Sequence, residues 1–156
     1  MSSAQKTHLL DLLTESHSST QEVLKKVGLD LQVYMDPVWR VRDILWHIAV
    51  WDRQATNSIL AFENGGQYAI QDFDEGVFNE AAFKEGREFT QDQVLEESNQ
   101  SRLEFQHAVQ KFPLDQLDSQ LLFPWGDEQG DVAKLVKYMI EHDNEHRAEI
   151  IAAGKF

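Results

Sequence analysis

Two histidines lie one helical turn apart near the carboxyl end of the chain. His142 and His146 are four residues apart, so on a helix they share one face and both imidazoles can reach one metal ion. Both fall in an apolar stripe with Leu135, Met139 and Ile150, which predicts that they point inward. A buried polar group without a partner costs about 1–3 kcal/mol. A shared metal ion would supply that partner.

His47 is the third candidate ligand. It lies among Ile44, Ile48 and Trp51, on the expected inward arc of an earlier helix and near the middle of that helix. Three inward imidazoles from two helices suit a divalent zinc, nickel or iron ion. Such a set leaves a coordination position open for water or substrate, as in catalytic rather than structural sites. The alternative is that the histidines are separate core residues, each satisfied by its own hydrogen bonds.

The other histidines and the local sequence narrow these interpretations. His17 also falls on an inward stripe, as a candidate fourth ligand or as a hydrogen-bonded core residue. His107 is off the stripe of its helix and is expected to be solvated. No role is assigned to His8, which lies near the beginning of the first helix. Residues 142–146 read HDNEH, with Asp rather than Glu directly after the first histidine. This order departs from the zinc-protease pattern and excludes a peptidase interpretation.

Charged residues near the histidines are candidates for acid–base and binding roles. Asp43 precedes His47 by one turn and could orient an imidazole or hold a water, or it could be a favourable charge early in a helix. Glu145 is a candidate general base or a solvated surface residue. Arg147 could hold an anionic group of a cofactor or substrate. Its alternative partner is Asp143, one turn earlier.

Four long helices account for the placement of these residues. Helical periodicity is strong over about residues 5–27, 36–63, 90–112 and 131–154. Because strand signals are poor, the sequence predicts an all-α protein built as a four-helix bundle.

Local signals predict where three of the helices begin. Asp36 and Pro37 suit the N-cap and first position of the second helix. Residues 90–93 (TQDQ) fit a capping box for the third, and Asp131 is a plausible N-cap for the fourth.

Two connections carry apolar residues. Residues 64–89 contain several aromatic side chains and are expected to pack against the bundle, with a short helix near residues 79–85. Residues 121–126 form an apolar loop just ahead of the last helix. Such loops either complete the core or cover a pocket.

Composition limits the classes of partner. The chain of 156 residues has 14 Lys+Arg against 27 Asp+Glu, a formal charge of −13, which argues against nucleic acid and anionic membranes as partners. It has no cysteine, which excludes disulfides, thiolate metal sites and a cysteine nucleophile of its own. The beginning lacks the apolar stretch of a signal peptide, so a cytoplasmic location is expected. The absence of a linker predicts one domain over residues 1–156.

Two motifs resemble those of the DinB-like (YfiT-like) family. Residues 46–52 (WHIAVWD) look like its second-helix motif, and residues 142–147 (HDNEHR) look like its last-helix motif. Residues 78–82 and 90–103 are similar to the branch that contains mycothiol-dependent maleylpyruvate isomerase. Length and helix order agree, so the resemblance covers most of the chain. It implies a four-helix bundle with a long second crossover connection, often dimeric.

The resemblance also implies a function. Carried over by position, the metal ligands would be His47, His142 and His146. Known activities in the family include transferases and isomerases that use mycothiol or bacillithiol, and an external thiol suits a chain without cysteine. The leading hypothesis is a metal-dependent enzyme that activates a low-molecular-weight thiol or water, for transfer to, or hydrolysis of, a small electrophilic substrate. The alternatives are a non-catalytic stress-response or binding module with a metal site, and a homodimer whose helices serve mainly for assembly.

Overall fold

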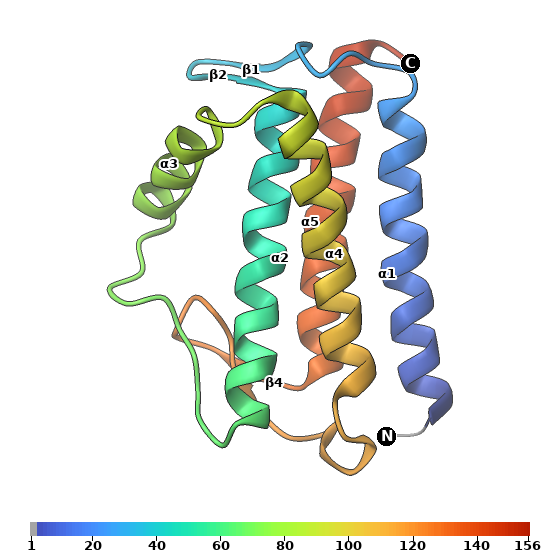
Figure 1. Ribbon diagram of the computed structural model, residues 1–156, viewed down its shortest axis with the longest axis vertical. Coiled ribbons are helices and arrows are strands. Elements are labelled where there is room, and N and C mark those ends of the chain that lie inside the picture. Colours follow the sequence, from blue (N-terminus) through green and yellow to red (C-terminus); the bar gives the residue numbers. More distant parts are fainter. Residues whose placement is uncertain (1–2) are drawn as a thin grey trace.

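Four long helices form the bundle in the computed structural model, which describes residues 3–156. They are α1 (Ser3–Leu24), α2 (Val41–Glu63), α4 (Gln91–Lys111) and α5 (Val132–Gly154). Figure 1 shows α1 and α5 running in one direction and α2 and α4 in the other. The most extensive packing is that of α2 on α4 and of α1 on α5. The predicted all-α four-helix bundle is confirmed.

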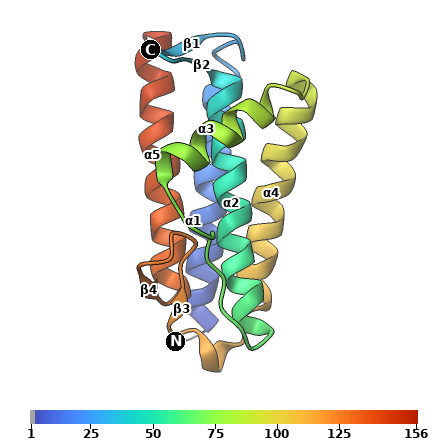
Figure 2. The ribbon, with the colours of Figure 1, turned by 90° about the vertical axis from the view of Figure 1, so that its left-hand side faces the viewer.

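The connection between α2 and α4 must return along the whole bundle, because these two helices are parallel. It spans residues 64–90 and contains α3 (Glu75–Gly86), which packs on α2. Figure 2 shows this segment running along the outside of α2. Oδ1 of Asp74 accepts a hydrogen bond from the backbone N–H of Val77 at 3.0 Å and so caps α3. The predicted short helix is confirmed, and it begins four residues earlier than expected.

Two helix starts agree with the sequence signals. At α4, Oγ1 of Thr90 accepts from the backbone N–H of Gln93 at 3.1 Å, and Oε1 of Gln93 accepts from the backbone N–H of Thr90 at 2.8 Å. At α5, Oδ1 of Asp131 accepts from the backbone N–H of Lys134 at 2.9 Å. The capping box and the N-cap are therefore confirmed.

The predicted start of the second helix at Asp36 and Pro37 is wrong. These two residues form the turn of an antiparallel hairpin between β1 (Gln32–Met35) and β2 (Val38–Arg40), and the peptide bond between them is cis. The helix begins only at Val41. An Asp-Pro pair is as favourable in a tight turn as at a helix start, so the local signal could not distinguish the two.

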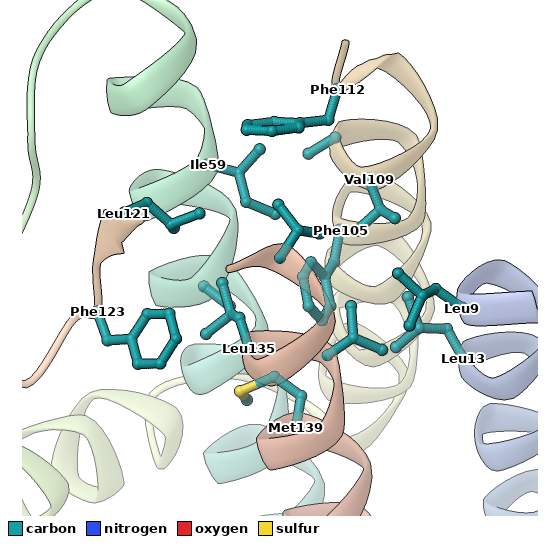
Figure 3. Packing of buried hydrophobic residues seen from close by; sticks show 14 of the residues in the cluster. Leu9, Leu13, Ile59, Phe105, Val109, Phe112, Leu121, Phe123, Leu135 and Met139 are labelled. Atoms are coloured by element: carbon teal, nitrogen blue, oxygen red, sulfur yellow. The ribbon is translucent and has the colours of Figure 1, made fainter. Parts of the chain in front are cut away.

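Of two clusters of buried hydrophobic residues, one packs around Ile44 and Ile150 against the hairpin, and the other fills the half of the bundle away from it (Figure 3). Leu13, Phe105 and Leu135 contribute from α1, α4 and α5 and are fully buried. The apolar loop ahead of α5 adds Leu121 and Phe123, also fully buried, beside a second short hairpin of β3 (Leu121–Leu122) and β4 (Gln129–Gly130). Within residues 3–156, no helix combines the length and the apolar character that a membrane crossing needs.

Gly86, the last residue of α3, brings that helix against the buried ring of Trp46 on α2. A Cβ at Gly86 would lie 2.5 Å from Cδ1 of Trp46, and Trp46 is itself stacked on Phe89. We therefore expect Gly86→Ala to lower the free energy of unfolding by about 1–3 kcal/mol, measured by urea denaturation. Gly28→Ala is the matched control, because its Cβ would meet no atom within 4 Å. Equal losses in the two variants would contradict the close contact.

Candidate metal centre

Three imidazole rings converge between α2 and α5, next to the β1–β2 hairpin. Nε2 of His47 lies 2.9 Å from Nε2 of His142, and Nε2 of His146 lies 3.1 Å from the same atom. The ring centroids of the three pairs are 4.6–4.9 Å apart. Across residues 3–156, these side chains are the one group of histidines and acidic residues close enough to share a metal ion. The structure thus brings together the three residues predicted as ligands.

The donor atoms fit a divalent ion. Two nitrogen ligands about 2.1 Å from one ion are about 3.0–3.4 Å apart at octahedral or tetrahedral angles, close to the observed Nε2 separations. Burial, and then the neighbouring His142 and His146, lower the pKa of His47 to about 2. Burial, and then His146, lower the pKa of His142 to about 4. Both rings are therefore neutral at pH 7, as metal ligation by imidazole requires.

His146 has partners on its other ring nitrogen. Its Nδ1 lies 2.8 Å from Oε1 of Glu149 and 3.1 Å from the hydroxyl of Tyr34. A carboxylate in this position holds the proton on Nδ1 and orients Nε2 toward a metal ion. Burial and the hydrogen bond to Glu149 raise the pKa of Tyr34. Sequence reasoning missed both partners, although Glu149 is one helical turn after His146.

The β1–β2 hairpin contributes a second contact to the centre. The ring of Trp39 on β2 meets the ring of His47 nearly edge to face, with centroids 5.4 Å apart. Together with Tyr34 on β1, this contact makes the hairpin part of the site. The sequence carries no separate signal for this role, because Asp36 and Pro37 fit a helix start as well as a turn.

Asp43 has other partners than the imidazoles. Its Oδ2 accepts from the backbone N–H of Arg40 at 2.8 Å, and its Oδ1 accepts from Nε of Arg87 at 2.9 Å. Nδ1 of His47 is buried and has no hydrogen-bond partner among the described residues. Asp43 therefore caps α2 and does not orient this ring. The catalytic role predicted for Asp43 stays a prediction that no contact supports.

Among the described residues, neither Glu145 nor Arg147 forms a hydrogen bond with the three rings. Glu145 is exposed. Its predicted role as a general base stays a prediction that no contact supports. Nη1 of Arg147 donates to the backbone carbonyl of Ser16 and to Oγ1 of Thr20, each at 3.0 Å, which ties α5 to α1. Its predicted contact with a cofactor or substrate is untested. The alternative of a surface pair with Asp143 is wrong, because Asp143 faces the core.

His17 is hydrogen-bonded across helices and is not part of the three-histidine group. Its Nε2 lies 2.9 Å from Oδ1 of Asn99 on α4, and burial lowers its pKa. The interpretation as a hydrogen-bonded residue is confirmed, and that of a fourth ligand is wrong. His107 is exposed, as expected.

A buried charge network lies beside the centre and was missed by the sequence analysis. Nε and Nη2 of Arg102 donate to Asp52 at 2.9 and 3.1 Å, and Nη1 and Nη2 donate to Asp143 at 2.8 and 2.9 Å. All three side chains are at most 2% exposed. The hydroxyl of Ser16 donates to Asp143 at 2.7 Å. The network joins all four bundle helices next to His142.

A cavity of about 340 Å³ opens on two of the three imidazoles. We call it the aromatic cavity. It is lined by His47, His142, Trp51, Phe73, Trp125, Tyr138, Met139, Glu75 and Glu128. Trp125 belongs to the apolar loop ahead of α5, so that loop both completes the core and forms part of a pocket wall.

We expect the metal-free protein to lose stability as the pH falls from 7 to 5. The pKa values of His47 and His142 in the folded protein, about 2 and about 4, lie below the ordinary value of 6.5. In this range the unfolded chain binds protons that the folded chain does not, so the free energy of unfolding falls by up to about 1.4 kcal/mol per pH unit for each group. Urea denaturation in EDTA measures the slope. His47→Gln, which cannot be protonated there, should have a shallower slope, and an unchanged slope would contradict the assignment.

The chain was compared with known families and solved structures. A family model described as the DinB superfamily matches residues 7–150. No match is found among the curated proteins. YfiT from Bacillus subtilis, described as a probable metal-dependent hydrolase with an unusual four-helix bundle topology, aligns with a TM-score of 0.77 and 17% identity, over 99% of this chain and 89% of its own.

Two further solved structures share the fold. Mycothiol-dependent maleylpyruvate isomerase aligns with a TM-score of 0.76 and 12% identity over 93% of this chain, which spans only 60% of the isomerase. An uncharacterized protein from Clostridium difficile 630 aligns with a TM-score of 0.73 and 13% identity, over 97% of this chain and 96% of its own. At these identities the likeness shows the fold alone.

Proposed function

This chain belongs to the DinB superfamily, and we propose that it is a metal-dependent enzyme that holds a divalent ion on His47, His142 and His146. The observation that carries the proposal is the convergence of three Nε2 atoms, two of which belong to rings that line a cavity, those of His47 and His142. A bound zinc, nickel or iron ion would supply Lewis-acid chemistry there, lowering the pKa of a coordinated water or thiol into the neutral range.

The chain's own side chains hold the ligands and shape the space beside them. Glu149 and Tyr34 keep His146 oriented toward the centre. His47 and His142 face the aromatic cavity, so the open side of the centre lies there. The rings of Trp51 and Trp125 give that space part of its apolar wall.

The chain has no cysteine, so a thiol that reacts at this centre has to come from outside the chain. We propose that the nucleophile is a low-molecular-weight thiol, such as mycothiol or bacillithiol, or a water, and that it attacks a small electrophilic substrate. The likeness to a mycothiol-dependent isomerase and to a probable metal-dependent hydrolase supports both versions. A volume of about 340 Å³ suits a small molecule. A homodimer in the cytoplasm is part of the same proposal.

The test combines metal analysis with turnover. Protein purified without a histidine tag is analysed for metals, loaded with zinc, nickel or iron, and assayed with 1-chloro-2,4-dinitrobenzene and mycothiol, bacillithiol or glutathione. Hydrolysis of p-nitrophenyl acetate without thiol tests the water version. We expect about one ion per chain and turnover that is lost in His47→Ala. Protein that cannot be loaded would contradict the metal site, and a loaded protein inactive in every assay would favour the binding module.

A further inference from the structure

The wall of the aromatic cavity is acidic where it is charged. Glu75 and Glu128 line it, and no lysine or arginine among residues 3–156 does. Lys134, which contacts two of the wall residues, is paired with Glu128 and lies over the ring of Tyr138, with Nζ 5.8 Å from the centroid. A ligand carboxylate or phosphate would therefore meet no unpaired lysine or arginine in the wall, whereas such groups are normally recognised by these residues. Arg147, the candidate for holding an anionic group, donates instead to Ser16 and Thr20 on α1.

Glu128 holds two of the aromatic rings in place. It accepts hydrogen bonds from Nε1 of Trp125 at 3.0 Å and from the hydroxyl of Tyr138 at 2.6 Å, and it pairs with Nζ of Lys134 at 2.9 Å. Its charge is thus matched by Lys134 and by two donors. The polar edges of both rings are occupied by Glu128, so what they offer a ligand is their apolar surface.

Four aromatic rings meet at steep angles around the cavity. The centroids of Trp125 and Tyr138 are 5.6 Å apart at an interplanar angle of 72°. Those of Trp51 and Phe73 are 5.8 Å apart at 87°, and those of Trp51 and Trp125 are 6.4 Å apart at 54°. The four rings thus line the cavity and pack on one another at an angle rather than as a parallel stack. The negative faces of such rings attract ammonium groups.

Glu75 is the carboxylate that remains available. It is the first residue of α3, it is exposed, and it lines the aromatic cavity. Among the described residues, no group forms a hydrogen bond or an ion pair with the carboxylate of Glu75. Glu80 on the same helix has a partner and a different position: it pairs with Lys84 at 3.2 Å and lines another groove. A free carboxylate beside several aromatic rings is a combination that binds an organic cation.

We propose that the aromatic cavity selects a substrate or thiol that carries a protonated amine or a quaternary ammonium group. The cationic group lies against the rings near Glu75, and the reacting end of the molecule reaches His47 and His142. That these molecules are reactants rests on the proposed function. Recognition of the cation rests on the cavity wall alone.

Isothermal titration calorimetry with three probes of similar size tests the selectivity. Benzyltrimethylammonium, benzyl alcohol and benzoate are compared at pH 7 in about 0.15 M salt, where charges beyond about 8 Å are screened. The first two are measured on the protein as purified and with one equivalent of zinc. All three probes are also compared after EDTA treatment, and benzoate is measured only in that form, because a bound ion would itself attract a carboxylate. We expect the cation to bind at least about tenfold more tightly than either other probe. Equal or tighter binding of benzyl alcohol or benzoate would overturn the inference.

Two matched variants locate the binding. Glu75→Gln should weaken binding of the cation about two- to fivefold and leave benzyl alcohol unaffected, whereas Glu80→Gln should change neither. Trp125→Leu should lower the affinity for the cation about tenfold. An unchanged far-UV circular dichroism spectrum checks that this variant is folded. Equal effects of the two glutamate variants would assign the binding to overall negative charge and overturn the inference.

The outcomes for the cavity and for the metal centre are separable. Protein that prefers the cation but takes up no metal would support the cavity inference and contradict the proposed enzyme. Protein that can be loaded and is active, but that prefers benzyl alcohol, or benzoate after EDTA treatment, would contradict the cavity inference alone.

Discussion

Replacing His142 with alanine lowers the affinity of the protein for Zn²⁺ by at least about 100-fold, because even the loss of an outer partner of a ligand costs about 10–100-fold. Nε2 of His142 is the middle donor of the three, 2.9 Å from Nε2 of His47 and 3.1 Å from Nε2 of His146. Without it, two imidazoles on different helices are left. Competition with a chromophoric chelator at pH 7 measures the affinity.

His17→Ala is the matched control for this variant. His17 is also a partly buried helical histidine, but it is bonded to Asn99 rather than to the three rings. Its replacement should leave Zn²⁺ affinity within about twofold of the original protein, as expected for a residue that is not a ligand. Wild-type affinity in His142→Ala, or an equal loss in both variants, would show that the ion binds elsewhere.

Replacing Arg102 with methionine lowers the free energy of unfolding by about 3–5 kcal/mol, the usual result of removing one partner from a buried ion pair. Methionine fills much of the space but leaves Asp52 and Asp143, which are 1% and 2% exposed, without their cation. Burial already raises the pKa of Asp52, so the unpaired carboxyl becomes still harder to ionise. Urea denaturation at pH 7 measures the loss.

Arg53→Met provides the comparison for Arg102→Met. Arg53 pairs with Glu97 and Glu104, but its side chain is 39% exposed, and pairs of this kind contribute about 0–1 kcal/mol. A second check adds Asp52→Asn to Arg102→Met, which removes one of the stranded charges and should recover part of the stability. A loss no larger in Arg102→Met than in Arg53→Met would mean that the buried network does not stabilise the bundle.

The helices and the three imidazoles could be predicted because both are encoded locally. The spacing of His142 and His146 places them on one face whatever the tertiary structure, and the apolar neighbours of His47 indicate which way it points. The hairpin was missed for the opposite reason. Asp36 and Pro37 are compatible with a turn and with a helix start, and only packing against the ends of α2 and α5 decides between them.

The buried charges were missed although each interrupts an apolar stripe. Arg102 lies four residues after Ser98 and three before Phe105, both on the inward stripe of α4. Asp52 and Asp143 occupy equivalent positions on α2 and α5. A charged residue on one inward stripe is unremarkable, but opposite charges on three such stripes predict a shared interior network. Which charge meets which depends on the helix order, and that is a tertiary property.

The Arg102 network also bears on how an ion at the proposed metal centre would exchange. Asp52 and Asp143 lie on the same two helices as His47 and His142, and their charges are satisfied by a side chain of the protein itself. We therefore expect a chelator to remove an ion bound at the three imidazoles without unfolding the bundle, unlike a zinc finger, which unfolds when its metal leaves. The three imidazoles would then stay in place to bind another ion, and the metals available around the protein would decide which ion is bound.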